Sequence, residues 1–238
     1  MKADAIIFDK DGTLLDFDAF WVTVSIKAIE VVLAQFRRQD VPVSEVLEAF
    51  GVHDGETDMN STLCKGTYEQ LGGLMYDILH RYGCEESCET VTKALIEAYN
   101  QNADAGDVKP TCPDLAEVLT KLKARNIKLA VVTTDNMHIT RTCLEKLGII
   151  DLFDKIYTDD GEVPTKPDPY CVYHFSEFAG VDQANVIMVG DTMTDMRFAK
   201  NAGIAAIGIA KQEANKQILA PHAAAVIPDP SRIFDLLD

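Results

Sequence analysis

The sequence predicts an α/β protein whose doubly wound, mostly parallel sheet is interrupted by an inserted α-helical domain. Three observations lead to this fold class. From residue 111 onward, short apolar runs alternate with helical patterns, which is the order expected of parallel strands joined by crossover helices. Residues 22–102 instead show helical patterns and no convincing strand. A buried strand is predicted at residues 5–9, and we expect it to rejoin the sheet across the insertion.

The length and composition fit a globular body with an inserted module. The chain has 238 residues, of which 47% are hydrophobic and 25% charged. We predict a core domain at residues 1–16 and 105–238 and a helical domain at residues 17–104. No run approaches the roughly 20 apolar residues of a membrane span, and the first apolar run is too short for a secretory signal. We therefore expect a cytoplasmic protein.

Four helices are predicted in the inserted domain, at residues 22–38, 43–50, 68–82 and 88–101. Thr67 and Ser87 stand at N-cap positions of the last two helices. The segment between the second and third helices, residues 51–66, is rich in Gly, Asp, Asn, Ser and Thr and predicts a long loop. Long loops in compact proteins are commonly functional, so we expect this segment to move when a lid opens and closes.

The core domain is predicted to alternate between helices and strands. Helices are expected at 115–124, 139–147, 169–180, 194–202 and 213–219, strands at 128–133, 155–158, 186–189, 205–209 and 224–227, and a final turn at 231–237. Glycines directly after several of these helical patterns support the helix ends. In such a sheet, ligands bind at the carboxyl ends of the strands.

Net charge and cysteine content limit the function. The 38 acidic and 22 basic residues give a formal charge of −16, which repels nucleic acid and anionic lipid, so we expect neither as a partner. A phosphorylated small molecule is repelled as well, so a phosphate site would need local positive charge from a metal, lysine or backbone amides. The six cysteines contain no CxxC pair and are predicted to be reduced thiols.

Two aspartates directly follow the first strand. If the chain stays extended, Asp9 and Asp11 point the same way and Lys10 points elsewhere. Carboxylates this close resist joint ionisation, so a divalent cation, a lysine or a retained proton has to offset them. Taken alone, an Asx turn around Gly12 explains the same residues equally well.

Further polar residues follow other predicted strands at the same edge of the sheet. They are Thr133 and Thr134, Lys166, and Asp191 with Asp195. Each has a structural alternative, since Thr134 or Asp135 could cap one helix, Asp191 or Thr192 could cap another, and an isolated lysine is usually a surface residue. Residues so far apart in the chain converge only in a fold of this kind, and this convergence favours one shared site.

The runs DKDGT, VVTT, KPDP and GDTMTD, taken together in this order, resemble the haloacid dehalogenase superfamily. The resemblance covers nearly the whole chain and is closest to the phosphoglycolate phosphatase-like branch, which has a helical cap between its first two motifs. It implies a Rossmann-like core, Mg2+ and hydrolysis of a phosphate monoester through an aspartyl-phosphate. The alternatives are a sugar phosphomutase similar to beta-phosphoglucomutase and a non-catalytic binding protein. A dehalogenase is less favoured, because such members do not need the aspartate at position 11.

The resemblance also implies roles for single residues. Asp9 would be the nucleophile, and Asp11 would protonate the leaving alcohol and then accept a proton from water. Thr133 would donate a hydrogen bond to the phosphoryl group, and Lys166 would offset the charges of Asp9 and the phosphate. The implied Mg2+ ligands are Asp9, the Asp11 backbone carbonyl, Asp191 and, directly or through water, Asp195.

The expected substrate is a small phosphorylated metabolite, with phosphoglycolate first, and the expected protein is a monomer or a homodimer. The residues expected to bind this substrate are Gly12, Thr133, Thr134, Lys166 and Lys65. Arg81 and His53 are further candidate anion partners in the helical domain, although all three of its basic candidates fit an ordinary surface as well. The aromatic residues Phe17, Phe20 and Trp21 are expected to pack at the hinge into the cap.

Overall fold

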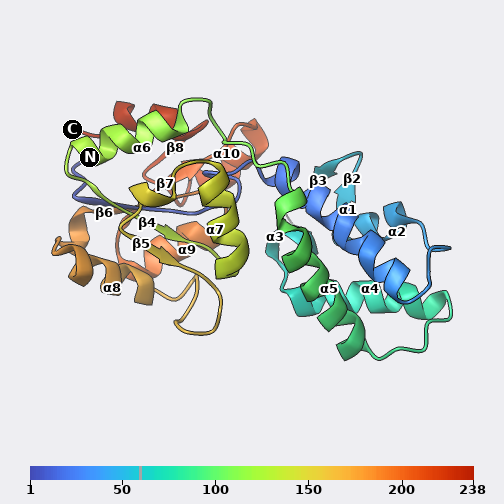
Figure 1. Ribbon diagram of the computed structural model, residues 1–238. Helices are drawn as coiled ribbons and strands as arrows, with labels where there is room; N and C mark the ends of the chain where they lie inside the picture. Colours follow the sequence, from blue (N-terminus) through green and yellow to red (C-terminus); the bar gives the residue numbers. More distant parts are fainter. Residues whose placement is uncertain (59–60) are drawn as a thin grey trace. The chain divides into compact units, whose positions relative to one another are not determined.

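The computed structural model describes residues 1–58 and 61–238. It divides into two compact units, which we call the α/β unit (residues 1–16 and 108–238) and the helical unit (residues 17–107) (Figure 1). The second junction follows Asp107 because the short 3-10 helix η1 (Ala103–Ala105) extends the last helix of the helical unit. Residues 59–60, which belong to the predicted loop, lie outside the described residues.

The α/β unit is built on a parallel sheet, which has six strands in the described part of the chain, in the order β5-β4-β1-β6-β7-β8. The strands are β1 (Ala5–Phe8), β4 (Lys128–Val132), β5 (Lys155–Tyr157), β6 (Val186–Gly190), β7 (Ala205–Ile209) and β8 (Ala225–Ile227). β1 lies in the interior of the sheet, where Ile7 stands opposite Ala130 on one side and Met188 on the other. The predicted α/β fold with a doubly wound parallel sheet is confirmed.

Both faces of the sheet are buried, which is why its strands are continuously apolar. Ile6 and Phe8 pack into a core with α6 (Leu115–Ala124), whereas Ala5 and Ile7 pack into a second core with α8 (Tyr170–Ala179) and α9 (Met193–Ala202). Figure 1 shows α6 on one side of the sheet and α8 on the other. The remaining helices are α7 (Met137–Lys146), α10 (Glu213–Leu219), and the 3-10 turns η2 (Ile150–Leu152), η3 (Gln183–Asn185) and η4 (Pro230–Asp235).

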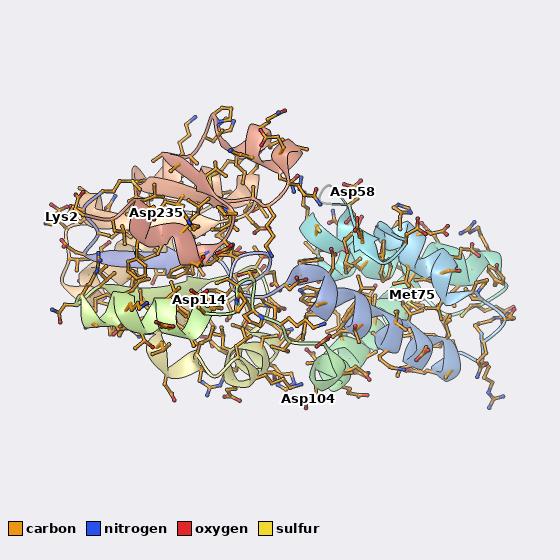
Figure 2. The ribbon with its side chains drawn as sticks, turned by 90° about the horizontal axis from the view of Figure 1, so that it is seen from above. Lys2, Asp58, Met75, Asp104, Asp114 and Asp235 are labelled. Carbon is orange, nitrogen blue, oxygen red and sulfur yellow. The ribbon has the colours of Figure 1, made fainter. Side chains whose placement is uncertain are left out.

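The helical unit contains α1 (Phe17–Gln35), α2 (Val43–Phe50), α4 (Tyr68–Arg81) and α5 (Cys88–Asn102). α1 begins at Phe17 and not at residue 22 as predicted, because the aromatic residues assigned to a hinge continue its apolar stripe. Trp21 of α1 packs against Tyr99 of α5, with ring centroids 5.8 Å apart. Met75 of α4, labelled in Figure 2, is fully buried in this unit.

The prediction that residues 22–102 contain no strand is wrong. Val52–His53 (β2) and Glu56–Thr57 (β3) form an antiparallel hairpin within the predicted loop, and Thr62–Lys65 (α3) forms a short helix. The hairpin turns at Asp54 and Gly55, which both have positive φ angles of 52° and 83°. An Asp-Gly pair is typical of such two-residue turns, but strands of two residues are too short to show a periodic pattern.

Among the described residues, no helix has the length and apolarity that crossing a membrane would require. The described residues include all six cysteines, and none of them forms a disulfide.

Candidate active site

A buried lysine joins two aspartates at the carboxyl edge of the sheet. Asp9 follows β1, and its amide donates to the Val189 carbonyl of β6 at 2.9 Å. Lys166 Nζ donates to Asp9 Oδ1 at 2.5 Å and to Asp195 Oδ1 at 2.7 Å. Lys166 is 7% exposed and Asp195 is fully buried. An ammonium at this depth is tolerated because it contacts two carboxylates at once.

A third carboxylate, that of Asp191, faces the same space. One oxygen each from Asp9, Asp191 and Asp195 lies within 4.8 Å of the others. Burial raises the pKa of Asp9 to about 7, against the opposing charge of Lys166, and burial together with the Asp9 charge raises the pKa of Asp191 well above its ordinary value. Three carboxylates facing one ammonium leave an excess of negative charge, and their hard oxygen donors are those that Mg2+ prefers. The donor set therefore fits a divalent cation.

Two glycines let these carboxylates approach the backbone. Gly12 has a φ of +73°, and a Cβ there would lie 2.1 Å from Asp191 Oδ2. A Cβ on Gly190 would lie 2.4 Å from Asp195 Cγ. Gly12 was expected to bind the substrate, and its amide donates to the Leu15 carbonyl at 2.8 Å. What Gly12 supplies in this structure is therefore the tight turn and the space for Asp191.

Asp195 also takes part in a capping box at the N-terminus of α9. Its Oδ2 accepts hydrogen bonds from the Thr192 amide at 3.0 Å and the Thr192 hydroxyl at 2.7 Å, and the Thr192 hydroxyl accepts from the Asp195 amide at 3.4 Å. Of the two capping residues considered for this helix, the structure has Thr192. Both Asp195 oxygens thus have protein partners, and Asp195 ties Lys166 to the helix start.

The expectation that Lys10 points away from its neighbours is wrong. Lys10 is fully buried, and its Nζ contacts both oxygens of Asp11, at 2.8 and 2.7 Å. It also lies 3.1 Å from Asp135 Oδ2, and these carboxylates raise the Lys10 pKa against the effect of burial. The alternation argument fails because β1 ends at Phe8 and the chain then turns. Lys10 and Asp135 were not among the predicted site residues.

The threonines after β4 are placed differently from one another. Thr133 is buried, and its hydroxyl accepts from the Asp135 amide at 3.2 Å, whereas Thr134 is exposed. Neither Thr134 nor Asp135 caps α7, because Asn136 fills that position and accepts from the Ile139 amide at 2.9 Å. The Thr133 hydroxyl keeps its proton available for a further acceptor, since in this contact it accepts.

The basic candidates of the helical unit lie on its surface. Lys65 is exposed at the end of α3 and lines a hollow of about 540 Å³. Arg81 pairs with Glu45 at 3.0 Å, as expected of a surface residue, and His53 is exposed in β2. The other residues that line the hollow are Ser61, Thr62, Gly66, Gln70, Gly73, Leu74 and Asp77.

Residues 3–203 match the family model of haloacid dehalogenase-like hydrolases. The chain belongs to this family. It is 31% identical to a phosphoglycolate phosphatase of Neisseria meningitidis over 208 residues, which cover 86% of this chain and 79% of that relative. The predicted family and the predicted class of enzyme, a phosphatase of the haloacid dehalogenase type, are confirmed.

Solved structures share the fold over nearly the whole chain. A predicted phosphoglycolate phosphatase from Haemophilus somnus is 20% identical, with a TM-score of 0.72 over 99% of this chain and 98% of that one. A candidate beta-phosphoglucomutase from Thermotoga maritima is 22% identical, with a TM-score of 0.70 over 98% of this chain and 97% of that one. At these identities the two structures establish the fold and do not distinguish hydrolysis from isomerisation.

Proposed function

We propose that this protein is a Mg2+-dependent phosphatase that hydrolyses a small phosphate monoester through phosphorylated Asp9. The observation that carries the proposal is the convergence of Asp9, Lys166, Asp191 and Asp195, from three separate segments of the chain, into one cluster. The family implies this chemistry. The proposed nucleophile, the candidate metal ligands and the ammonium are in this cluster, and the proposed acid, Asp11, lies two residues after the nucleophile.

In the proposed first step, an Asp9 oxygen attacks phosphorus and the bond from phosphorus to the ester oxygen breaks. Asp11 gives its proton to the departing alkoxide, so that a neutral alcohol leaves. Lys166 offsets the charge that gathers on Asp9 and the phosphoryl oxygens, and the Thr133 hydroxyl and Thr134 amide donate to the phosphoryl group. In the second step water attacks phosphorus, Asp11 takes up its proton, and Asp9 is released.

Asp9, the Asp11 carbonyl and Asp191 would hold Mg2+, with Asp195 acting through water because its oxygens bond Lys166 and Thr192. When bound, the ion supplies charge that screens the repulsion between the carboxylates and an anionic ester. Asp195 would then position Lys166, and Gly12 would give Asp191 its place beside the turn.

Phosphoglycolate is the leading substrate, on the strength of the Neisseria meningitidis relative and of the small anionic ester that the site suits. Lys65 in the helical unit is the proposed selector of the substrate's second anionic group. This role predicts that Lys65→Gln reduces the hydrolysis of phosphoglycolate more than that of a generic aryl phosphate.

The test is a phosphate-release assay with phosphoglycolate, a sugar phosphate and p-nitrophenyl phosphate, in Mg2+ and in excess chelator. We expect release that requires the metal and is abolished by Asp9→Asn, with that variant remaining folded by circular dichroism. A folded, active Asp9→Asn variant would exclude the nucleophile, and rates unaffected by chelator would exclude the metal.

The same assay separates the alternatives. A sugar phosphomutase would give isomerised sugar phosphate with little free phosphate, and a binding protein would release none from any ester. No observation in the described part of the chain favours either over hydrolysis, and every residue type that the proposed phosphatase chemistry requires is present in the α/β unit.

A further inference from the structure

We infer that Lys10 is a positioning residue for Asp11 and holds its carboxyl group in the orientation in which it gives a proton to the leaving group and, as the carboxylate, takes one up from water. The inference rests on the proposed function and adds to it a residue that the family motifs leave without a role. It follows from the contacts of Lys10, from its burial and from the elements that it joins.

The ammonium of Lys10 contacts the carboxylate of the next residue in the chain. Lys10 Nζ reaches both oxygens of Asp11, at 2.8 and 2.7 Å, so rotation of the carboxylate would break at least one contact. The side chain of Lys10 is fully buried and that of Asp135 is 5% exposed, whereas that of Asp11 is 17% exposed. Asp11 is therefore the member of this group most open to a substrate.

The other side of the ammonium is anchored to a rigid element. Lys10 Nζ lies 3.1 Å from Asp135 Oδ2, and Asp135 Oδ1 accepts from the Asn136 amide at 2.8 Å. Asn136 is the N-cap of α7, which fixes this carboxylate at the start of a helix. Because β1 and β4 are neighbours in the sheet, Lys10 links the loops that follow two adjacent strands.

Burial of the Lys10 ammonium carries a desolvation penalty. Its removal from water is strongly unfavourable, and an apolar side chain of similar length would pack without that cost. Two carboxylates offset the cost here, and the more exposed of them is the proposed acid. Proton transfer requires the acid within roughly 2.6–3.2 Å of the leaving oxygen, so a carboxylate free to rotate would meet this requirement less often.

The decisive measurement compares Lys10→Met with the wild-type protein on two esters. kcat/KM reports the steps up to release of the alcohol, which include protonation by Asp11. The alkoxide of phosphoglycolate needs a proton to leave, whereas p-nitrophenolate leaves without one. We expect kcat/KM to fall about 10- to 100-fold for phosphoglycolate and to change little for p-nitrophenyl phosphate. Lys146→Met, an exposed lysine on α7, should change neither.

A second comparison asks whether Lys10 acts through Asp11. In a protein that already carries Asp11→Asn, adding Lys10→Met should cause no further loss on phosphoglycolate, because the residue that it positions has been neutralised. Losses that multiply, or a Lys10→Met loss that is equal on both esters, would overturn the inference and leave the proposed function standing. A wild-type protein that releases phosphate from no ester would overturn both.

Folding of the variant requires its own control. Lys10→Met leaves Asp135 buried without its ammonium, and a buried charge without a partner strongly lowers stability. The double variant Lys10→Met/Asp135→Asn removes that uncompensated charge at nearly constant shape. If the single variant unfolds, the double variant carries the comparison, and the same dependence on the leaving group is expected of it.

Discussion

Replacing Lys166 with methionine tests how strongly the carboxylate cluster depends on its ammonium. Methionine keeps most of the side-chain volume, so the loss is mainly electrostatic. Lys166 donates to Asp9 and Asp195 at 2.5 and 2.7 Å, and its side chain is 3% exposed. Breaking a buried pair of this kind costs about 3–5 kcal/mol, because the remaining charge stays buried without a partner. That is a large share of the roughly 5–15 kcal/mol by which a domain is stable.

Urea unfolding in excess chelator measures this loss, and the same measurement in Mg2+ adds a sharper test. Lys166 repels a cation, so its removal should increase the stabilisation that Mg2+ provides, and the gap between variant and wild type should narrow. Lys123→Met is the matched control. The side chain of Lys123 is 31% exposed and that of its partner Asp154 is 17% exposed, so this ion pair should contribute only about 0–1 kcal/mol. A Lys166→Met loss below about 1 kcal/mol, or a gap that Mg2+ leaves unchanged, would refute the reasoning.

Two further predictions concern the turn and a second ion pair. Gly12→Ala should lower stability by more than the roughly 1–2 kcal/mol that a left-handed alanine costs, and it should also reduce phosphate release, because its Cβ would meet Asp191. The control is Gly180→Ala, where φ is +66° and the space around the Cβ is open. In urea unfolding this control should show the backbone cost alone. Burial acts to raise the pKa of Asp154. The hydrogen bonds from Lys123 and the Leu129 amide outweigh burial and hold this pKa below its ordinary value. Asp154→Asn should therefore cost about 1–2 kcal/mol near neutral pH, and this difference should disappear as pH falls below about 4; a loss that persists in acid would contradict it.

The sequence was sufficient for the α/β sheet and for the approach of Asp9, Lys166 and Asp195 to one another at its edge. Apolar runs of four or five residues that alternate with helical patterns are typical of buried strands, and parallel strands place their carboxyl ends together. This is why Asp9, Lys166 and Asp195, from three separate motifs, could be expected in one place before their contacts were known. Their roles in catalysis stay a proposal.

Other features depend on contacts that no local pattern reveals. Lys10 was expected to point away because alternation was extended past Phe8, where β1 ends, and its contacts with Asp11 and Asp135 explain why its ammonium is buried. The strands β2 and β3 are too short for periodicity, although the Asp54-Gly55 pair was a usable turn signal. The start of α1 was missed because Phe17 and Trp21 were assigned to a hinge and not to a helix face.

The position of β1 in the sheet has a consequence for the order in which the molecule forms during synthesis. Both neighbours of β1 follow the helical unit in the chain, since β4 begins at Lys128 and β6 at Val186. A growing chain therefore exposes this apolar strand while the whole helical unit is being made, at a stage when nothing can pair with it. Asp9 is made before the helical unit, yet it acquires its surroundings only after Asp195 has been added.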